Sequence, residues 1–374
     1  MNILQFKKSL IQYSKEIGID KIGFTTVDPF LTLKQRLYKQ QELNYQSGFE
    51  AKDIERRVDA RKIMNEAQSI IAIALAYPSK MNDSPKSKKG STRGIFCRAS
   101  WGEDYHNVVK KKLLLLEEFI LLHFPNAKIQ SMVDTGELVD RAVAERAGIG
   151  WSGKNCSIIT PEFGSYVYLG EMITSLPLEP DTPIEDECGE CTKCLDVCPT
   201  SALVAPGQLN AQNCIAFLTQ TKNMIPLEFR KEVGNRIYGC DTCQTVCPKN
   251  KGINFTHHKE MEPDPETVKP LLRSVLTLSN REFKNQFGAM SGSWRGKNPI
   301  QRNAIIALAH FKDDSALEEL KEIATKDARP VLRGTAIWAI SEIEGAKSYP
   351  FIEQCLQNEK DNIVIEEINS ILSK

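Results

Sequence analysis

The chain has 374 residues, of which 41% are hydrophobic and 26% charged, and its 48 acidic and 48 basic side chains balance to zero net charge. These values are typical of a globular protein with two or three domains. They exclude a strongly basic nucleic-acid-binding protein, so any site for a polyanion must be local. The N-terminal residues lack a signal-peptide pattern, and the most apolar run, 69–77, is too short to span a membrane. We therefore expect a cytoplasmic protein, in which the eleven cysteines favour metal ligands over disulfides.

The first 180 residues are predicted to form a mixed α/β domain. Helical periodicity and strand-like apolar runs alternate, with helices expected at 3–17 and 108–124 and strands at 20–25, 69–77, 156–160 and 165–173. Residues 78–94 are rich in Pro, Ser, Lys and Gly and are expected to form a solvated loop. Three prolines and several acids at 175–187 mark the junction with the next domain.

Two polar motifs in this domain need separate interpretation. Residues 148–153 read GIGWSG, but a helix is predicted before them and a strand after them. A dinucleotide site needs the opposite order, so we expect these glycines to end a helix and allow close backbone approach to a ligand. Asp134 and Thr135 precede a helical pattern, and this placement favours an N-cap or Asx-turn over a general acid near a redox centre.

Residues 188–203 read CGECTKCLDVCPTSAL and contain four cysteines with the C-x2-C-x2-C-x3-C-P spacing of bacterial [4Fe–4S] ferredoxins. In two-cluster ferredoxins the fourth cysteine of such a run ligates the other cluster. A second, shorter run ends in Cys247-Pro248, and Cys214 can supply its missing ligand. We assign one cluster to Cys188, Cys191, Cys194 and Cys247, and the other to Cys198, Cys214, Cys240 and Cys243. The alternative is structural zinc, which two interleaved runs ending in Cys-Pro disfavour.

Three cysteines remain outside these runs. Cys355 lies in a helical stretch and Cys156 begins an apolar run, so both are predicted to be small buried residues. Cys97 lies among aromatic, basic and glycine residues after a strand-like segment, and burial is also the favoured interpretation for it.

The C-terminal region, 261–374, contains an internal repeat. Residues 304–308 match residues 336–340 at an offset of 32, and Pro330 opens the second unit. Two-helix units of this kind resemble HEAT repeats, which stack because one unit cannot bury its own apolar face. Such a short array either binds a large partner or caps the protein, and the sequence leaves both open.

Basic and aromatic residues alternate between 281 and 302. Basic side chains contact phosphates and aromatic rings stack on unpaired bases, so this segment is a candidate RNA-binding surface. The alternative is a solvated linker whose aromatic rings pack inward. The residues concerned are Arg281, Lys284, Arg295, Lys297 and Arg302 with Phe283, Phe287 and Trp294.

Several segments, taken in order, resemble the epoxyqueuosine reductase family over essentially the whole chain. They are DKIGF at 20–24, GIFCRASWGEDYH at 94–106, VDTGELVDRAVAERAGIGWSGKN at 133–155, EFGSYVYLGEM at 162–172, both cysteine runs and SGSWRGKNPIQRNA at 291–304. The resemblance implies an oxidoreductase that converts epoxyqueuosine to queuosine in the anticodon loop of tRNA. It further implies a cobalamin-binding catalytic domain (1–180), a ferredoxin-like domain with two [4Fe–4S] clusters (181–260), and a tRNA-contacting segment with HEAT-like repeats (261–374).

The resemblance also assigns roles to residues. It makes Asp134 the proton donor above the cobalt, against the N-cap interpretation. The cofactor-binding residues that it implies are Arg57, Cys97, Asp134, Ile158, Ile159, Thr160, Cys240 and Asp241. The chain has no D-x-H-x-x-G segment, so no histidine is expected to ligate cobalt.

The implied substrates are the tRNAs for Asp, Asn, His and Tyr, which have G-U-N anticodons. We expect their phosphates to contact Lys222, Arg281, Lys284, Arg295, Lys297 and Arg302. The protein is expected to be a monomer that receives electrons from an unidentified low-potential donor. Two alternatives are a plain two-cluster electron carrier and a corrinoid, iron–sulfur reductive dehalogenase acting on a small molecule.

Overall fold

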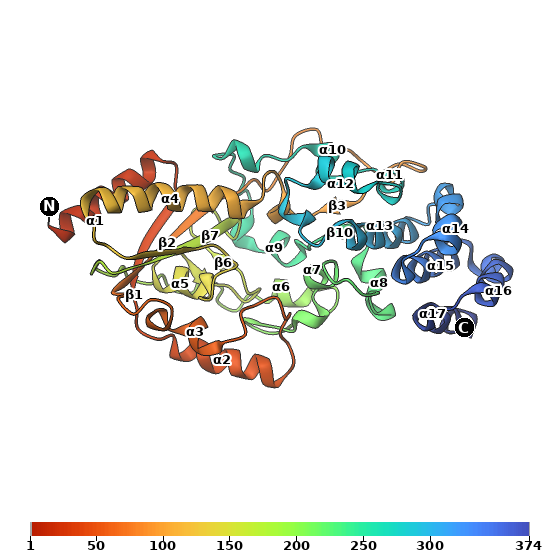
Figure 1. The fold of residues 1–374 in the computed structure, drawn as a ribbon, viewed down its shortest axis with the longest axis horizontal. Coiled ribbons are helices and arrows are strands. Elements are labelled where there is room, and N and C mark those ends of the chain that lie inside the picture. Colours follow the sequence, from red (N-terminus) through yellow and green to blue (C-terminus); the bar gives the residue numbers. More distant parts are fainter. Residues whose placement is uncertain (1, 374) are drawn as a thin grey trace. The chain divides into compact units, whose positions relative to one another are not determined.

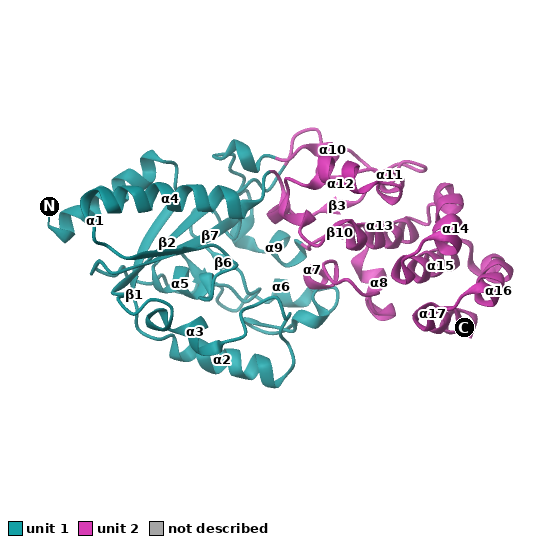
Figure 2. Ribbon diagram, viewed as in Figure 1, with its two compact units in different colours: residues 1–80, 103–214, 241–262 teal, residues 81–102, 215–240, 263–374 magenta. Residues whose placement is uncertain are grey.

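A computed structural model describes residues 2–373 of the chain. These residues form two compact units, each assembled from three chain segments (Figure 2). Unit 1 comprises 1–80, 103–214 and 241–262, and unit 2 comprises 81–102, 215–240 and 263–374. The predicted boundaries at 180 and 260 remain predictions. Among the described residues, none of the helices has the length and apolar character needed to cross a membrane.

Unit 1 is built on a four-stranded antiparallel sheet with the order β1-β2-β7-β4, and Figure 1 labels β1, β2 and β7 of this sheet. Its strands are β1 (Lys21–Thr26), β2 (Ser69–Ala76), β7 (Val167–Thr174) and β4 (Ile129–Met132). All eight residues of β2 are buried, as expected for an apolar strand covered on both faces. The predicted strands at 20–25, 69–77 and 165–173 are confirmed, whereas the one at 156–160 shortens to β6 (Ile158–Ile159).

Helices cover the two faces of this sheet. On one face lies α4 (Tyr105–His123), which packs against α1 (Ile3–Glu16). Leu113, Leu116 and Ile120 follow helical spacing along the buried stripe of α4, and each contributes about 1.5–3 kcal/mol of burial. The short helix α5 (Asp140–Arg146) packs on β7 and β2 through a separate apolar cluster. Helices α4 and α5 therefore both pack on the central sheet.

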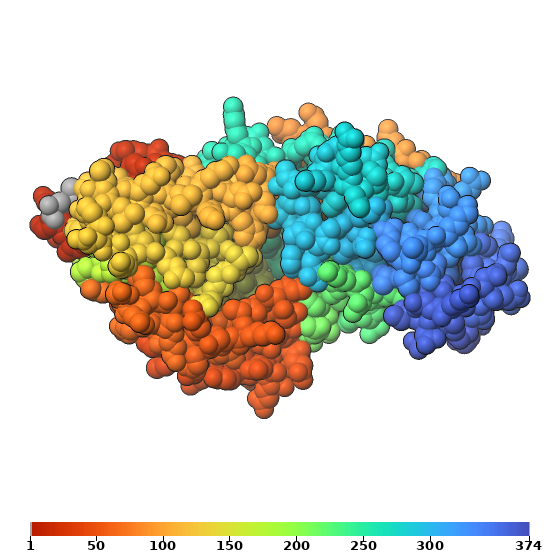
Figure 3. All heavy atoms as spheres, viewed as in Figure 1, coloured from red at the N-terminus to blue at the C-terminus, as the bar shows by residue number. Residues whose placement is uncertain are grey.

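The rest of unit 1 consists of short elements around the sheet. Helix α2 (Leu31–Glu42) buries no residue and forms part of the outer surface (Figure 3). The remaining α-helices and strands are α3 (Ile54–Val58), β5 (Trp151–Ser152), α6 (Lys193–Asp196), β8 (Leu203–Ala205), β9 (Gln208–Leu209) and α9 (Thr242–Thr245). Helix α5 precedes the 148–153 glycine segment and β5 begins within it, so the inverted order predicted for this motif is confirmed.

Unit 2 contains a two-stranded parallel sheet and a series of helices. Strand β3 (Ile95–Phe96) pairs with β10 (Arg236–Tyr238). The helices are α7 (Ile215–Leu218), α8 (Leu227–Val233), α10 (Pro265–Val268), α11 (Leu272–Leu276), α12 (Asn280–Phe287), α13 (Lys297–Phe311), α14 (Leu317–Lys326), α15 (Pro330–Glu344), α16 (Tyr349–Asn358) and α17 (Asn362–Leu372).

The internal repeat corresponds to paired helices in unit 2. Residues 304–308 lie in α13 and residues 336–340 lie in α15, and all of these side chains are buried in one core cluster. Pro330 starts α15, because its missing N–H costs nothing in the first turn of a helix. The predicted fold class, mixed α/β followed by C-terminal helical repeats, is confirmed.

Candidate active site and iron–sulfur sites

Asp134 lies in a tight turn after β4. Its backbone adopts a left-handed conformation with φ of 51°, which Asp tolerates better than most residues. Helix α5 begins six residues later, at Asp140, with Val139 as its N-cap. The N-cap interpretation of Asp134 is therefore wrong, because the polar residues after β4 form a turn instead of starting the helix. The side chain of Asp134 is 65% exposed and available to a ligand.

Two side chains from the start of α4 contact the Asp134 carboxylate. The Tyr105 hydroxyl donates a hydrogen bond of 2.8 Å to Oδ2, and Nε2 of His106 lies 3.5 Å from the same oxygen. The second distance is that of an ion pair. Asp104 is the N-cap of α4, and its carboxylate also lies 2.7 Å from Nδ1 of His106. His106 thus lies between two carboxylates.

The charges of this group depend on one another. Asp104, and then Asp134, raise the pKa of His106 to about 9. The interaction with His106, assisted by Tyr105, lowers the pKa of Asp134 although the partial loss of solvent around the carboxylate acts in the opposite direction. At neutral pH the proton therefore resides on the imidazole, next to an ionised Asp134. Sequence reasoning overlooked Tyr105 and His106, although an Asp followed two residues later by His at a helix start was a usable signal.

The turn at Asp134 is also fixed by a hydrogen bond from its backbone. The backbone N–H of Asp134 donates a 2.9 Å hydrogen bond to Oδ2 of Asp140, the first residue of α5. Burial, opposed by this hydrogen bond and reinforced by the charge of Asp134, raises the pKa of Asp140 to about 6. Asp140 is consequently mostly ionised at neutral pH, and its charge strengthens the hydrogen bond that fixes the turn.

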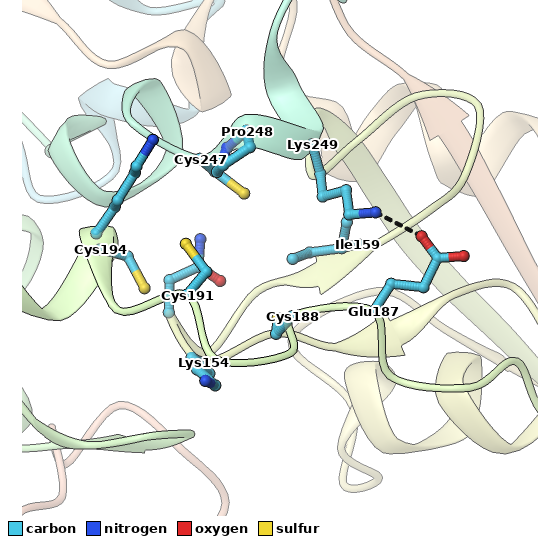
Figure 4. Close-up of a pocket in the computed structure, with 11 residues that line it drawn as sticks. Lys154, Ile159, Glu187, Cys188, Cys191, Cys194, Cys247, Pro248 and Lys249 are labelled. Carbon is cyan, nitrogen blue, oxygen red and sulfur yellow. Dashed lines mark hydrogen bonds and ion pairs between the residues drawn. The ribbon is translucent and has the colours of Figure 1, made fainter.

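Four cysteines line one cavity of about 220 Å³ in unit 1 (Figure 4). They are Cys188, Cys191, Cys194 and Cys247, the set predicted to bind the first cluster. Three lysines, Lys154, Lys193 and Lys249, also line the cavity and supply positive charge near the thiolates of a loaded cluster. Burial, together with the neighbouring cysteines, raises the pKa of the Cys194 and Cys247 thiols in the ligand-free chain. The residues present fit a [4Fe–4S] cluster.

A [4Fe–4S] cluster takes one thiolate at each of four irons, and this cavity offers four cysteines. No disulfide joins the eleven cysteines, all of which lie in the described range.

The loop after α9 is tied to the sheet by protein hydrogen bonds. Asn250 is buried, and its side chain accepts from Ser165 N at 2.7 Å while donating to Ser165 Oγ and Gln244 O. Gln244 donates to the carbonyl and hydroxyl oxygens of Ser165. A Cβ at Gly164, where φ is 56°, would lie 2.1 Å from Oδ1 of Asn250, so this position requires glycine. The Cys247 loop is thus anchored next to β7 by side chains of the chain itself.

The second predicted cluster set is divided along the chain. Cys198, Cys214 and Cys243 belong to unit 1, and Cys240 ends a segment of unit 2. Its ligand assignment remains a prediction. The other cysteines follow expectation in part, since Cys355 is buried whereas Cys97 and Cys156 are only partly buried. Cys156 also has a left-handed backbone with φ of 64°.

The residues predicted to contact the corrin occupy both units. In unit 2, Cys97 N donates to Tyr238 O at 2.9 Å, and a Cβ at Gly239 would lie 2.2 Å from the Cys97 sulfur. The structure thus brings Cys97 close to the segment that leads into Cys240. In unit 1 lie Arg57, Asp134, Ile158, Ile159, Thr160 and Asp241. The side chains of residues 158–160 are buried, and Ile159 lines the cysteine cavity, so any corrin contact there would involve backbone.

The prediction that Arg302 contacts phosphate is wrong. Its side chain is 1% exposed and donates to backbone carbonyls of Leu218, Thr221 and Asn223. Asn303 donates to the carbonyls of Thr219 and Ile237. The pair therefore shapes the turn at 218–223 from inside unit 2. A sequence pattern of basic residues does not distinguish an arginine that binds phosphate from one that satisfies buried carbonyls.

The other predicted RNA contacts are accessible in unit 2. Lys222, Arg281 and Lys284 are exposed, whereas Arg295 and Lys297 are partly exposed. Phe283 and Phe287 pack into the core, as the linker alternative predicted, but Trp294 is 51% exposed. The Arg295 guanidinium lies 4.7 Å from the centre of the Trp294 ring, and Trp294 Nε1 donates to Gln220 Oε1 at 2.8 Å.

Known families match three parts of the chain. The matching models are "4Fe-4S double cluster binding domain" at 187–250, "Epoxyqueuosine reductase QueG, DUF1730" at 57–135 and "HEAT repeats" at 297–372. Epoxyqueuosine reductase from Bacillus anthracis is 63% identical over 369 residues, covering 99% of this chain and 97% of that protein. The chain belongs to the epoxyqueuosine reductase family.

Other members of the epoxyqueuosine reductase family are similar in sequence and structure. The Bacillus subtilis enzyme is 64% identical over 96% of this chain and 94% of its own length. A solved epoxyqueuosine reductase bound to an epoxyqueuosine-modified tRNA-Tyr stem loop is 64% identical and superposes with a TM-score of 0.96 over 98% of both chains. A Bacillus subtilis structure with the Asp134 catalytic loop swung out of the active site is 62% identical, with a TM-score of 0.96 over 98% of both chains. This chain is accordingly an oxidoreductase with a double [4Fe–4S] cluster-binding domain and HEAT repeats.

Proposed function

We propose that this chain reduces epoxyqueuosine to queuosine in tRNA, using cobalamin and two [4Fe–4S] clusters. The observation that carries the proposal is the exposed Asp134 turn, which is bonded to Tyr105 and next to a protonated His106. When bound, the cobalamin supplies a low-potential reducing centre and the clusters deliver its electrons one at a time. The residues of this chain position the base, exclude water and provide protons.

That no histidine ligates cobalt stays an expectation from the sequence, which has no D-x-H-x-x-G segment. Arg57, Cys97, Asp134, residues 158–160 and the Cys240-Asp241 pair would hold the corrin.

Asp134 and His106 together form a proton source. In the open site Asp134 is ionised and His106 holds the proton. A cofactor and a base that displace water raise the pKa of the Asp134 carboxyl, so the proton moves from the imidazolium to Asp134. Asp134 then gives it to the departing oxygen, and Tyr105 keeps the carboxyl aligned.

We assign the binding of the tRNA substrate to residues of unit 2. The exposed cations Lys222, Arg281 and Lys284, with Arg295 and Lys297, would contact phosphates of the anticodon arm. The structure of a related epoxyqueuosine reductase contains an epoxyqueuosine-modified tRNA-Tyr stem loop. We extend this to the tRNAs with G-U-N anticodons for Asp, Asn, His and Tyr, modified by a cytoplasmic monomer that takes electrons from a low-potential donor.

An anaerobic turnover assay tests the proposal. Reconstituted protein, cobalamin, a strong reductant and epoxyqueuosine-containing tRNA are combined, and released nucleosides are weighed by mass spectrometry. We expect cobalamin-dependent loss of one oxygen atom with the wild type. Asp134→Asn should bind tRNA and retain its cofactors but lose turnover. An unchanged nucleoside, with clusters and corrinoid present and reducible, would favour a small-molecule corrinoid reductase.

A further inference from the structure

Asn155 lies in the connection of a short hairpin and lines the cavity of the four cysteines. Strands β5 and β6 pair antiparallel, and residues 153–157 connect them. A hydrogen bond of 2.8 Å from Gly153 N to Ser157 O closes this loop. Asn155 is only 6% exposed. It shares the cavity with the cysteines predicted to bind the first cluster, which are Cys188, Cys191, Cys194 and Cys247.

One half of the Asn155 side-chain amide has a partner and the other half does not. Oδ1 accepts a hydrogen bond of 3.2 Å from the backbone N–H of Ser157, so the oxygen of the amide faces the loop. The nitrogen Nδ2 is buried, and no atom of the described residues accepts a hydrogen bond from it. A buried N–H group without an acceptor is costly for a fold to retain. We therefore look for the acceptor in whatever occupies the cavity.

The loop is shaped to hold Asn155 at the cavity. A Cβ at Gly153 would lie 2.8 Å from Oδ1 of Asn155 and 2.5 Å from Cδ1 of Ile159, which also lines the cavity. This close approach requires glycine at the last position of the GIGWSG motif. The carbonyl of Lys154 accepts a hydrogen bond of 3.0 Å from Gly207 N, which ties the loop to the connection between β8 and β9. Asn155 is thus positioned before any ligand binds.

The lysines of the cavity differ from Asn155 in their partners. Lys249 forms an ion pair of 2.5 Å with Glu187 (Figure 4), and Lys154 donates to the carbonyl of Gly189. Lys193 is exposed to solvent. Asn155 therefore differs from all three lysines in offering the cavity a buried, neutral N–H group that no protein atom uses.

A [4Fe–4S] cluster would provide the missing acceptor. Its sulfides and its cysteine thiolates carry negative charge, and hydrogen bonds to these sulfurs are one of the factors that set the reduction potential of such a cluster. Reduction adds one electron and no proton, so the negative charge on the sulfurs increases. An N–H group that faces a sulfur then binds the reduced form more strongly than the oxidised form, and this difference raises the reduction potential.

We propose that Asn155 donates its side-chain N–H to a sulfur of the first cluster and thereby makes this cluster easier to reduce. The inference rests on the first cluster of the proposed function, and it is independent of cobalamin and tRNA. In the reaction, Asn155 would favour the uptake of an electron from the external donor at the cavity of the four cysteines.

A redox titration of the reconstituted protein, followed by electron paramagnetic resonance, tests the proposal. Asn155→Ser keeps an oxygen that can accept from Ser157 N, but it removes the amide N–H. At the potential where the wild-type first cluster is half reduced, the ratio of reduced to oxidised first cluster should fall about fivefold in Asn155→Ser. This is the factor expected for the loss of one typical hydrogen bond. The signal of the first cluster is the one that Cys188→Ser abolishes.

Asn210→Ser is the matched control. Oδ1 of Asn210 accepts a hydrogen bond of 3.1 Å from Gln212 N, which is the same kind of turn, and Asn210 is not part of the cavity lining. This control should leave the ratio for the first cluster unchanged. An unchanged ratio in Asn155→Ser, with the iron content of the wild type, would overturn the proposal.

A second measurement needs no variant to assemble. In wild-type protein labelled with ¹⁵N at its asparagine side chains, electron–nuclear double resonance of the reduced first cluster should detect coupling to a side-chain nitrogen. Asn250 follows Cys247 closely in the chain, but its Nδ2 donates to Ser165 and Gln244. The coupling should be absent from Asn155→Ser, and its absence from the wild type would overturn the proposal.

The same experiments separate this inference from the proposed function. A wild-type protein that binds both clusters and shows the coupling, but does not reduce epoxyqueuosine in tRNA, would contradict the proposed function alone. A wild-type protein that takes up no cluster at the four cysteines would overturn both.

Discussion

Replacing Asp104 by Asn offers a direct test of the charge arrangement around Asp134. In the structure two carboxylates raise the pKa of His106 from 6.5 to about 9, and Asp104 is the larger contributor. This increase corresponds to roughly 3 kcal/mol in favour of the imidazolium. Because Asp104 supplies the larger share, Asp104→Asn should remove the larger part of the increase in the pKa of His106.

The assay is an NMR titration of the His106 ring protons, assigned by comparison with His106→Gln. Asp134→Asn provides the matched comparison and should lower the pKa of His106 by the smaller share. The reasoning is refuted if wild-type His106 titrates near 6.5, or if Asp104→Asn leaves its pKa unchanged. The same interaction affects stability. A pKa raised by folding stabilises the protein fully below pH 6.5, and this contribution disappears as the pH rises through about 9.

Three further results are expected. Cys188→Ser and Cys198→Ser should each abolish one cluster and so reduce bound iron by about half, as measured by iron analysis and electron paramagnetic resonance of the reconstituted protein. Loss of all iron in both variants would contradict two separate ligand sets. Arg302→Ala should lower the free energy of unfolding, measured in urea, by more than about 3 kcal/mol because buried carbonyls lose their donor. Lys222→Ala should leave that free energy unchanged, and it should reduce by about one the slope of the logarithm of the tRNA-binding constant against the logarithm of salt concentration. Trp294→Ala should weaken tRNA binding by about 1–3 kcal/mol without altering that salt dependence, since stacking involves no counterion release; an altered salt slope would refute a stacking role.

Much of the fold followed from pattern. The apolar run at 69–77 became the central strand β2, and the 32-residue repeat became α13 and α15, because both signals come from burial along one element. The cysteine spacing identified the cluster-binding region because it, too, is a signal contained in a short stretch of sequence. Ligand spacing is local, and it places Cys188, Cys191 and Cys194 around the cavity that Cys247 completes.

The charged residues were harder to place. Arg302 looks like the other cations of its segment, and only tertiary packing shows that its guanidinium serves the carbonyls of 218–223. His106 gains its significance from Asp134, a residue far away in sequence whose carboxylate lies 3.5 Å from its ring. Sequence periodicity describes which face of an element is buried, but it contains no information on which charges meet across elements.

The anchoring of Asn250 has a consequence for how the chain acquires iron. Cys247 lies on a loop that Asn250 and Gln244 fasten to Ser165 without any help from metal. Residues 188–198 contain only the four-residue helix α6, and none of them is fully buried. Assembly of this cluster therefore begins from a preformed side, and the entropy lost on maturation falls mainly on residues 188–198. In cells starved of iron, we expect proteases to cut the chain within residues 188–198 earlier than within the Cys247 loop.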